Sequence, residues 1–113
     1  MNKRTVGTEK EKLAAEYLVG KGYRILDMNY RCKTGEIDII ASHEDTFVFA
    51  EVKYRAGKRY GTAVEAVSAA KQKTIRQVAM YYLVTRLHKS NVGCRFDVIG
   101  IDRDEITHII NAF

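Results

Sequence analysis

Two strand-like runs near the middle of the chain carry acidic residues among apolar ones. The runs cover residues 35–41 and 47–53, and both are rich in isoleucine, valine and phenylalanine. The polar residues 42–45 between them are typical of a turn. We therefore expect an antiparallel hairpin that brings Asp38 near Glu51.

The second run carries its charges on one face. Because side chains alternate along a strand, Glu51 and Lys53 project in the same direction. Phe47 and Phe49 begin the same face, and Asp38 is itself surrounded by isoleucines. The pattern thus predicts that two carboxylates and an amine share one pocket beside an apolar core.

The periodicity of the rest of the chain predicts two helices and three more strands. The expected elements are a helix over about 8–21, a strand over 23–29, a loop over 54–62, a helix over about 64–87 that could break near Ser68, and strands over 95–101 and 106–110. The second helix has an apolar stripe made of Ile75, Val78, Ala79, Tyr82 and Leu83. This order of elements predicts an α/β or α+β fold around a central mixed sheet.

The length favours one domain over residues 1–113, because a chain of 113 residues is too short for two ordinary domains. No run approaches the roughly 20 apolar residues that cross a bilayer, and residues 1–4 lack the apolar stretch of a secretion signal. Cys32 and Cys94 stand far apart and fit reduced thiols. We expect a cytoplasmic protein with no membrane partner.

Charge adds a mild preference for nucleic acid as a partner. Lysine and arginine outnumber the acids 19 to 14, which gives a net charge of +5. The basic residues that would border the acidic pocket are Lys53, Arg55, Lys58, Arg59, Lys71, Lys73 and Arg76.

The acidic pocket has the chemistry that phosphodiester cleavage requires. Asp38 and Glu51 offer hard oxygen ligands for Mg²⁺ or Mn²⁺, and the backbone carbonyl of Val52 could add another. The ammonium of Lys53 could orient water or stabilise developing charge. The alternative is a solvated strand face with a cross-strand ion pair, which contributes roughly 0 to 1 kcal/mol to stability.

An acid followed by Glu-x-Lys on the next strand resembles the PD-(D/E)xK nuclease signature. Nearly the whole chain resembles the YraN family of small uncharacterised bacterial proteins. The motifs that carry this resemblance are Leu13-Ala14-Ala15, Gly22-Tyr23, Asn29-Tyr30-Arg31, Gly35-Glu36-Ile37-Asp38, Glu51-Val52-Lys53, Arg55, Gly61, Glu65-Ala66-Val67 and Arg95-Phe96-Asp97-Val98. The resemblance implies an α/β, restriction endonuclease-like core of three layers, with helices flanking the sheet. It implies fold more firmly than function.

The resemblance also implies roles for single residues. Asp38 and Glu51 would be metal ligands, Lys53 the catalytic lysine, and Glu11 the acid that resolvase-like nucleases carry on the first helix. Glu11 has a second explanation, since Thr8 and Glu11 have the spacing of a capping box.

Three basic residues are candidates for contacts with nucleic acid. Arg31 and Arg55 could position a DNA backbone, and Lys71 could touch a phosphate. Each has an ordinary alternative as a surface arginine or as an amphipathic lysine along an apolar stripe.

The leading hypothesis is a metal-dependent nuclease that acts on DNA. Similarity to resolvases suggests branched DNA, and paired cuts at a junction would favour a homodimer. One alternative is a nucleic-acid-binding protein that keeps the fold and does not cut. The other is a structural protein in which Asp38, Glu51 and Lys53 form a buried ion network.

Overall fold

The computed structural model describes residues 3–55, 67–88 and 92–113, without the side chains of residues 3–8 and Arg55. Two helices and five strands follow one another along the chain. They are α1 (Lys3–Gly20), β1 (Arg24–Arg31), β2 (Glu36–His43), β3 (Thr46–Arg55), α2 (Ala69–Leu87), β4 (Cys94–Asp102) and β5 (Glu105–Ile109). The expected order of helix, three strands, helix and two strands is confirmed.

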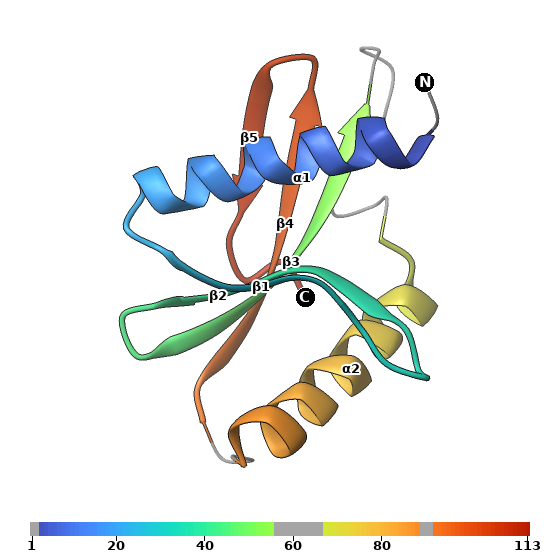
Figure 1. Ribbon diagram of the computed structural model, residues 1–113, viewed down its shortest axis with the longest axis vertical. Coiled ribbons are helices and arrows are strands. Elements are labelled where there is room, and N and C mark those ends of the chain that lie inside the picture. Colours follow the sequence, from blue (N-terminus) through green and yellow to red (C-terminus); the bar gives the residue numbers. More distant parts are fainter. Residues whose placement is uncertain (1–2, 56–66, 89–91) are drawn as a thin grey trace.

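The five strands form one mixed sheet in the order β1-β2-β3-β4-β5. Neighbouring strands are antiparallel except for β3 and β4, which are parallel because α2 connects them across one face of the sheet. Figure 1 shows α1 on one side of the sheet and α2 on the other. The structure is therefore an α/β fold of three layers, as expected for a restriction endonuclease-like core.

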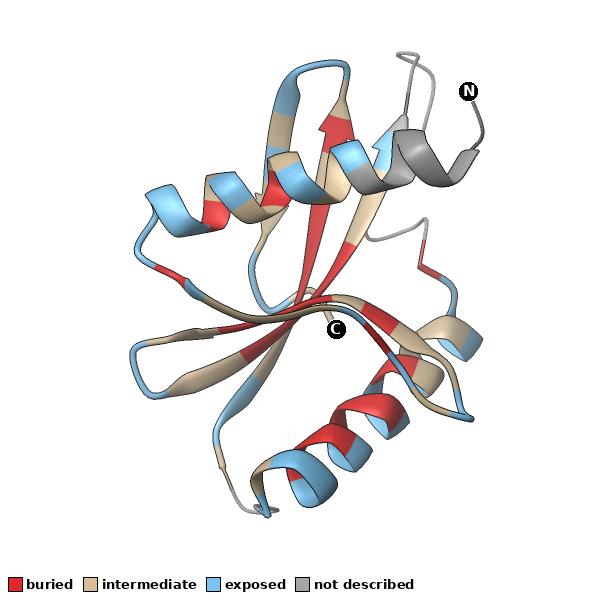
Figure 2. Cartoon of the chain, in the orientation of Figure 1, coloured by how far each residue is buried: buried red, intermediate tan, exposed pale blue. Residues whose placement is uncertain are grey.

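Each helix covers one face of the sheet, and the buried residues of the helix and of that sheet face together form one apolar cluster (Figure 2). The α1 side contains Ala14, Leu18, Tyr23, Ile39, Ala41, Val48, Ala50, Ile99 and Ile101. The α2 side contains Tyr30, Ile37, Ile40, Phe49, Val67, Ile75, Val78, Ala79, Tyr82, Leu83 and Val98. All five residues of the predicted stripe on the second helix are buried, so the helical periodicity identified its inward face correctly.

Helix α1 begins earlier than the sequence predicted. Because α1 starts at Lys3, Thr8 lies inside the helix. The capping-box explanation of Glu11 is therefore wrong, since a capping residue must precede the first turn. Ser68 is the N-cap of α2 and accepts a hydrogen bond from the Lys71 backbone N–H at 3.2 Å, so it begins the helix. The predicted start at residues 64–66 lies outside the described residues.

The predicted hairpin forms, with a tighter turn than residues 42–45. Strand β2 continues through His43 and β3 begins at Thr46, so Glu44 and Asp45 alone remain in the turn. Glu44 adopts the left-handed backbone conformation with a φ of 55°. Of the predicted loop over 54–62, residues 54 and 55 belong to β3 and the rest lie outside the described residues.

Candidate active site

The candidate site lies where the regular pairing of β2 with β3 stops. The register runs from His43 opposite Thr46 to Ile39 opposite Ala50. The next two positions would be Asp38 and Glu51, which are the acids that the hairpin was expected to bring together.

Strands β1 and β2 are both irregular beside Asp38. Asn29 has a positive φ of 54°, and the register passes from Met28 opposite Ile39 to Tyr30 opposite Ile37. Met28 and Ile39 belong to the cluster under α1, whereas Tyr30 and Ile37 belong to the cluster under α2. Residues two apart in a regular strand share a face, so both strands change face around Asn29 and its neighbour in β2.

This irregularity directs Asp38 toward β3. Its Oδ2 accepts a hydrogen bond from the backbone N–H of Val52 at 2.8 Å. Because the N–H and C=O of one residue in an extended strand point to the same edge, the Val52 carbonyl oxygen faces the same gap. The Asp38 carboxylate and the Val52 carbonyl therefore approach one space between β2 and β3.

Glu51 is buried on the α2 side, with 5% of its surface exposed. Its Oε2 lies 3.9 Å from the Lys53 Nζ and 3.3 Å from the Lys71 Nζ. Lys53 belongs to the same strand face, and Lys71 comes from the first turn of α2. The predicted grouping of two carboxylates and an amine is thus present in space, with a second amine added by the helix.

The environment of Glu51 favours its protonated form. Burial raises the pKa of its carboxyl to about 8, together with the charge of Asp38 and a hydrogen bond to that residue. Lys71 and Lys53 act in the opposite direction and lower this pKa. A raised pKa on one of two neighbouring acids is expected, because a nearby like charge and burial both disfavour its charged form.

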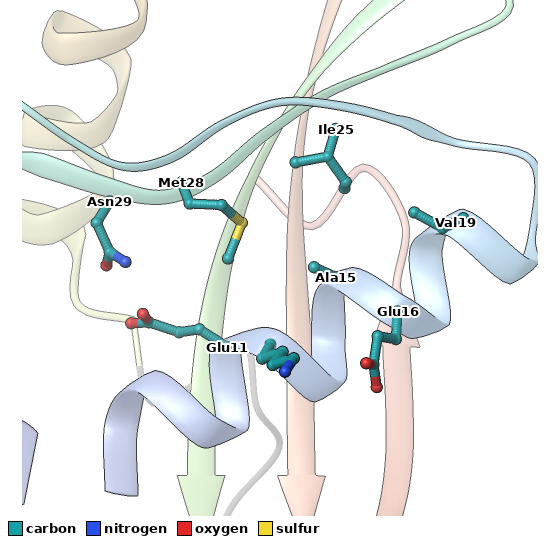
Figure 3. Close-up of a pocket in the computed structure, with 8 residues that line it drawn as sticks. Glu11, Ala15, Glu16, Val19, Ile25, Met28 and Asn29 are labelled. Atoms are coloured by element: carbon teal, nitrogen blue, oxygen red, sulfur yellow. The ribbon is translucent and has the colours of Figure 1, made fainter. Parts of the chain in front are cut away.

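Glu11 joins the cluster from α1. Burial raises the pKa of Glu11, and so does the neighbouring Asp38, while a hydrogen bond with Asn29 lowers it. In Figure 3 its carboxylate points away from the helix axis and toward Asn29. Its inward position follows from its place one turn before the buried Ala14.

The donor set fits a hard divalent cation that keeps part of its water. In the described ranges 3–55, 67–88 and 92–113, no group of three or more His, Cys, Asp or Glu side chains could hold a metal ion. Asp38 and Glu51 nevertheless form a pair of oxygen donors beside the Val52 carbonyl. Mg²⁺ is commonly bound through one or two carboxylates, with water and substrate oxygens completing its octahedron.

The other candidate residues are placed differently. Arg31 pairs with Glu36 directly across β1 and β2, with its Nε 3.0 Å from Oε2, and its side chain is 65% exposed. The side chain of Arg55, like residues Gly61, Glu65 and Ala66 of the motifs, lies outside the described residues.

Sequence patterns did not identify Asn29 as a neighbour of Glu11. The available signal was an asparagine within a strand-like run, since asparagine adopts the left-handed conformation more readily than most residues.

A second polar cluster lies on the α1 side of β4. Asp97 is fully buried and its carboxylate accepts two hydrogen bonds from Arg95, at 2.8 and 2.9 Å. His108 Nε2 lies 2.7 Å from Asp97 Oδ2, and the Asn111 backbone N–H donates at 3.0 Å. Every oxygen of this carboxylate has a protein partner, which indicates that it joins β4 to β5 and the end of the chain.

Fold and site together define an α/β protein with a cluster of acids and lysines at a split in a mixed sheet. The model of the uncharacterised protein family UPF0102 matches residues 10–101. The chain is similar to UPF0102 proteins of Alkaliphilus oremlandii, at 50% identity, and of Clostridioides difficile, at 47%, with all of each chain covered. It is 46% identical to one from Lachnoclostridium phytofermentans, covering 100% of this chain and 96% of the relative.

The chain therefore belongs to family UPF0102, the YraN family that its motifs resemble. Neither α1 nor α2, as far as the structure describes them, is long and apolar enough to cross a membrane.

Proposed function

We propose that this protein is a metal-dependent nuclease that hydrolyses phosphodiester bonds of DNA. The observation that carries the proposal is the environment of Glu51. It is a buried acid that shares a hydrogen bond with Asp38 and lies between two lysine ammonium groups. A strongly shifted pKa with specific charged partners is typical of functional sites.

Asp38, Glu51 and the carbonyl of Val52 would hold Mg²⁺ or Mn²⁺. When bound, the ion supplies Lewis acidity and positive charge at the scissile phosphate. Asp38 is preset for this role because the Val52 N–H holds its Oδ2 at 2.8 Å. Loss of the Glu51 proton would free that carboxylate to bind a cation beside Asp38.

The two lysines have separate tasks in the proposed reaction. Lys53 is 29% exposed and shares the strand face of Glu51, so its ammonium can orient the attacking water and stabilise charge on the phosphate. Lys71 is 40% exposed at the start of α2, where it can hold a phosphate oxygen of the DNA backbone. Glu11 approaches Asp38 from the opposite side and would orient a water molecule.

The net charge of +5 supports a polyanionic substrate. Arg31, with its largely exposed guanidinium, and Arg55 would contact the DNA backbone away from the reacting phosphate. Branched DNA remains the proposed substrate, which would favour a homodimer because paired cuts require two sites. Such a substrate agrees with the cytoplasmic location expected from the sequence.

The test is cleavage of labelled four-way junction, flap, single-stranded and duplex DNA with Mg²⁺ or Mn²⁺, and with EDTA. Glu51→Gln removes a proposed ligand, and Glu36→Gln is its matched control. Glu36 is also a glutamate on this sheet, but it is paired with Arg31 near the surface.

We expect metal-dependent cutting by the natural protein and by Glu36→Gln, and a loss of at least about a hundredfold in Glu51→Gln. Binding without cutting would replace this proposal with the alternative of a nucleic-acid-binding protein that retains the fold. Cutting that survives in Glu51→Gln would assign the activity to a contaminant or to other residues.

A further inference from the structure

A groove between α1 and β1 opens next to the candidate active site. Its volume is about 560 Å³, which is within the range of small-molecule pockets. Ala15 and Val19 line it from α1, and Ile25 and Met28 line it from β1 (Figure 3). Val19 is 56% exposed, so this apolar wall is accessible from solvent.

One end of the groove is polar and belongs to the site. Glu11 and Asn29 both line the groove, and Glu11 interacts with Asp38 as well as with Asn29. Figure 3 shows the Glu11 carboxylate at the same end as Asn29, with Met28 beside them. A ligand in the groove would therefore lie next to a phosphate placed at Asp38.

The charges of the lining favour a neutral ligand. Lys12 and Glu16 also border the groove and offset each other, which leaves Glu11 as the unbalanced charge. A phosphate would be repelled by that carboxylate, whereas a flat group with N–H donors could bond to the Glu11 oxygens and to the Asn29 amide. Apolar walls with a few polar groups at one end are typical of sites that bind a nucleobase.

We propose that this groove receives an unpaired nucleobase adjacent to the phosphate that the protein cuts. The inference rests on the proposed nuclease function and defines its substrate as DNA with an unpaired nucleotide at the cut. A base within an intact duplex is disfavoured because it must first unstack and unpair, which costs a few kcal/mol. Side chains of Met28, Ile25 and Val19 would contact the faces of the base, and Glu11 and Asn29 would contact its edge.

The test uses a DNA duplex with one unpaired 2-aminopurine, and the same duplex with 2-aminopurine paired. Binding is measured in EDTA, so that fluorescence and affinity are recorded without cleavage. Val19→Asp places a charge in the apolar wall. Val84→Asp is the matched control, because Val84 is a valine 45% exposed near the end of α2 and does not line the groove.

We expect the unpaired 2-aminopurine to change its fluorescence on binding and the bulged duplex to bind about tenfold more tightly than the paired one. Val19→Asp should abolish both differences and Val84→Asp should retain them. Because Val19 is largely exposed, both variants should keep the melting temperature of the natural protein within a few degrees.

Cleavage in Mg²⁺ separates this inference from the proposed function. If bulged and paired DNA are cut equally, and Val19→Asp does not change the cutting, the groove is not a base site, but the proposed nuclease function stands. A fluorescence change that depends on Val19, without any cutting, would support the base site in a protein that binds and does not cleave. Failure to bind either DNA in EDTA would overturn the inference.

Discussion

The replacement Glu51→Gln tests the electrostatics of the site without DNA. Glu51 is 5% exposed, and burial and the charge of Asp38 raise its pKa from 4.5 to about 8. Glutamine has nearly the same shape and stays neutral at every pH. The variant thus removes the titration of this position while preserving its packing.

The sign of the pH effect follows from where the proton is held. Between pH 4.5 and 8 the folded protein keeps the Glu51 proton and the unfolded chain releases it. The stability that this proton contributes is full below about pH 4.5 and is lost as the pH rises through about 8. Each pKa unit corresponds to about 1.36 kcal/mol, so the natural protein should lose about 2 to 3 kcal/mol from this group between pH 5 and pH 7.

Urea unfolding at pH 5, 6 and 7 in EDTA measures the difference. The free energy of unfolding of the natural protein should fall across this range by about 2 to 3 kcal/mol more than that of Glu51→Gln. Glu36→Gln, at a carboxylate paired with Arg31 near the surface, should retain the slope of the natural protein. Parallel curves for Glu51→Gln and the natural protein would refute the reasoning, and would mean that the lysines keep Glu51 ionised in a structural ion network.

Two further predictions follow from individual hydrogen bonds. Asp38→Asn keeps an oxygen that can accept the Val52 N–H and removes one acidic charge. In EDTA the free energy of unfolding of this variant should equal or exceed that of the natural protein. Addition of Mg²⁺ should raise the melting temperature of the natural protein and leave that of the variant unchanged. A free energy of unfolding several kcal/mol below that of the natural protein would contradict this prediction. For Asp97, burial alone would raise the pKa, but hydrogen bonds with His108, Arg95 and the Asn111 backbone lower it below 3.8. Its contribution to stability is present above that value and is lost as the pH falls through the folded-state pKa. Asp97→Ala should cost about 3 kcal/mol at pH 7, because it removes the carboxylate that pairs with the Arg95 guanidinium. Urea unfolding at pH 7 and pH 3 should show that this cost shrinks in acid, and an equal cost at both pH values would contradict the prediction.

Local patterns were sufficient to predict the hairpin and the residues that it brings together. Strand alternation correctly placed Glu51 with Phe49 on one face, and helical spacing correctly identified the buried stripe of α2. These patterns are reliable because the periods of strand and helix follow from backbone geometry and do not depend on distant parts of the chain. The start of α1 was predicted less accurately, at about residue 8 instead of Lys3, because the ends of a helix are the least well defined part of its pattern.

The approach of Lys71 to Glu51 was decided by the tertiary structure. Its ammonium is nearer to Glu51, at 3.3 Å, than that of Lys53 at 3.9 Å. The sequence predicted that Lys71 lies along the apolar stripe of a helix and borders the acidic pocket, but it did not predict the contact with Glu51. Its distance from a strand residue 20 positions earlier depends on how α2 packs against the sheet.

By itself, the sequence determined the two acidic strands, the lysine beside Glu51 and the mixed α/β order, because each depends on short-range periodicity and turn residues. The tertiary structure decided the split between β2 and β3, the left-handed Asn29 and the groove under α1. These features arise where neighbouring strands of the sheet and a helix from another part of the chain pack against one another. Packing across the sheet, which no local pattern encodes, sets their positions.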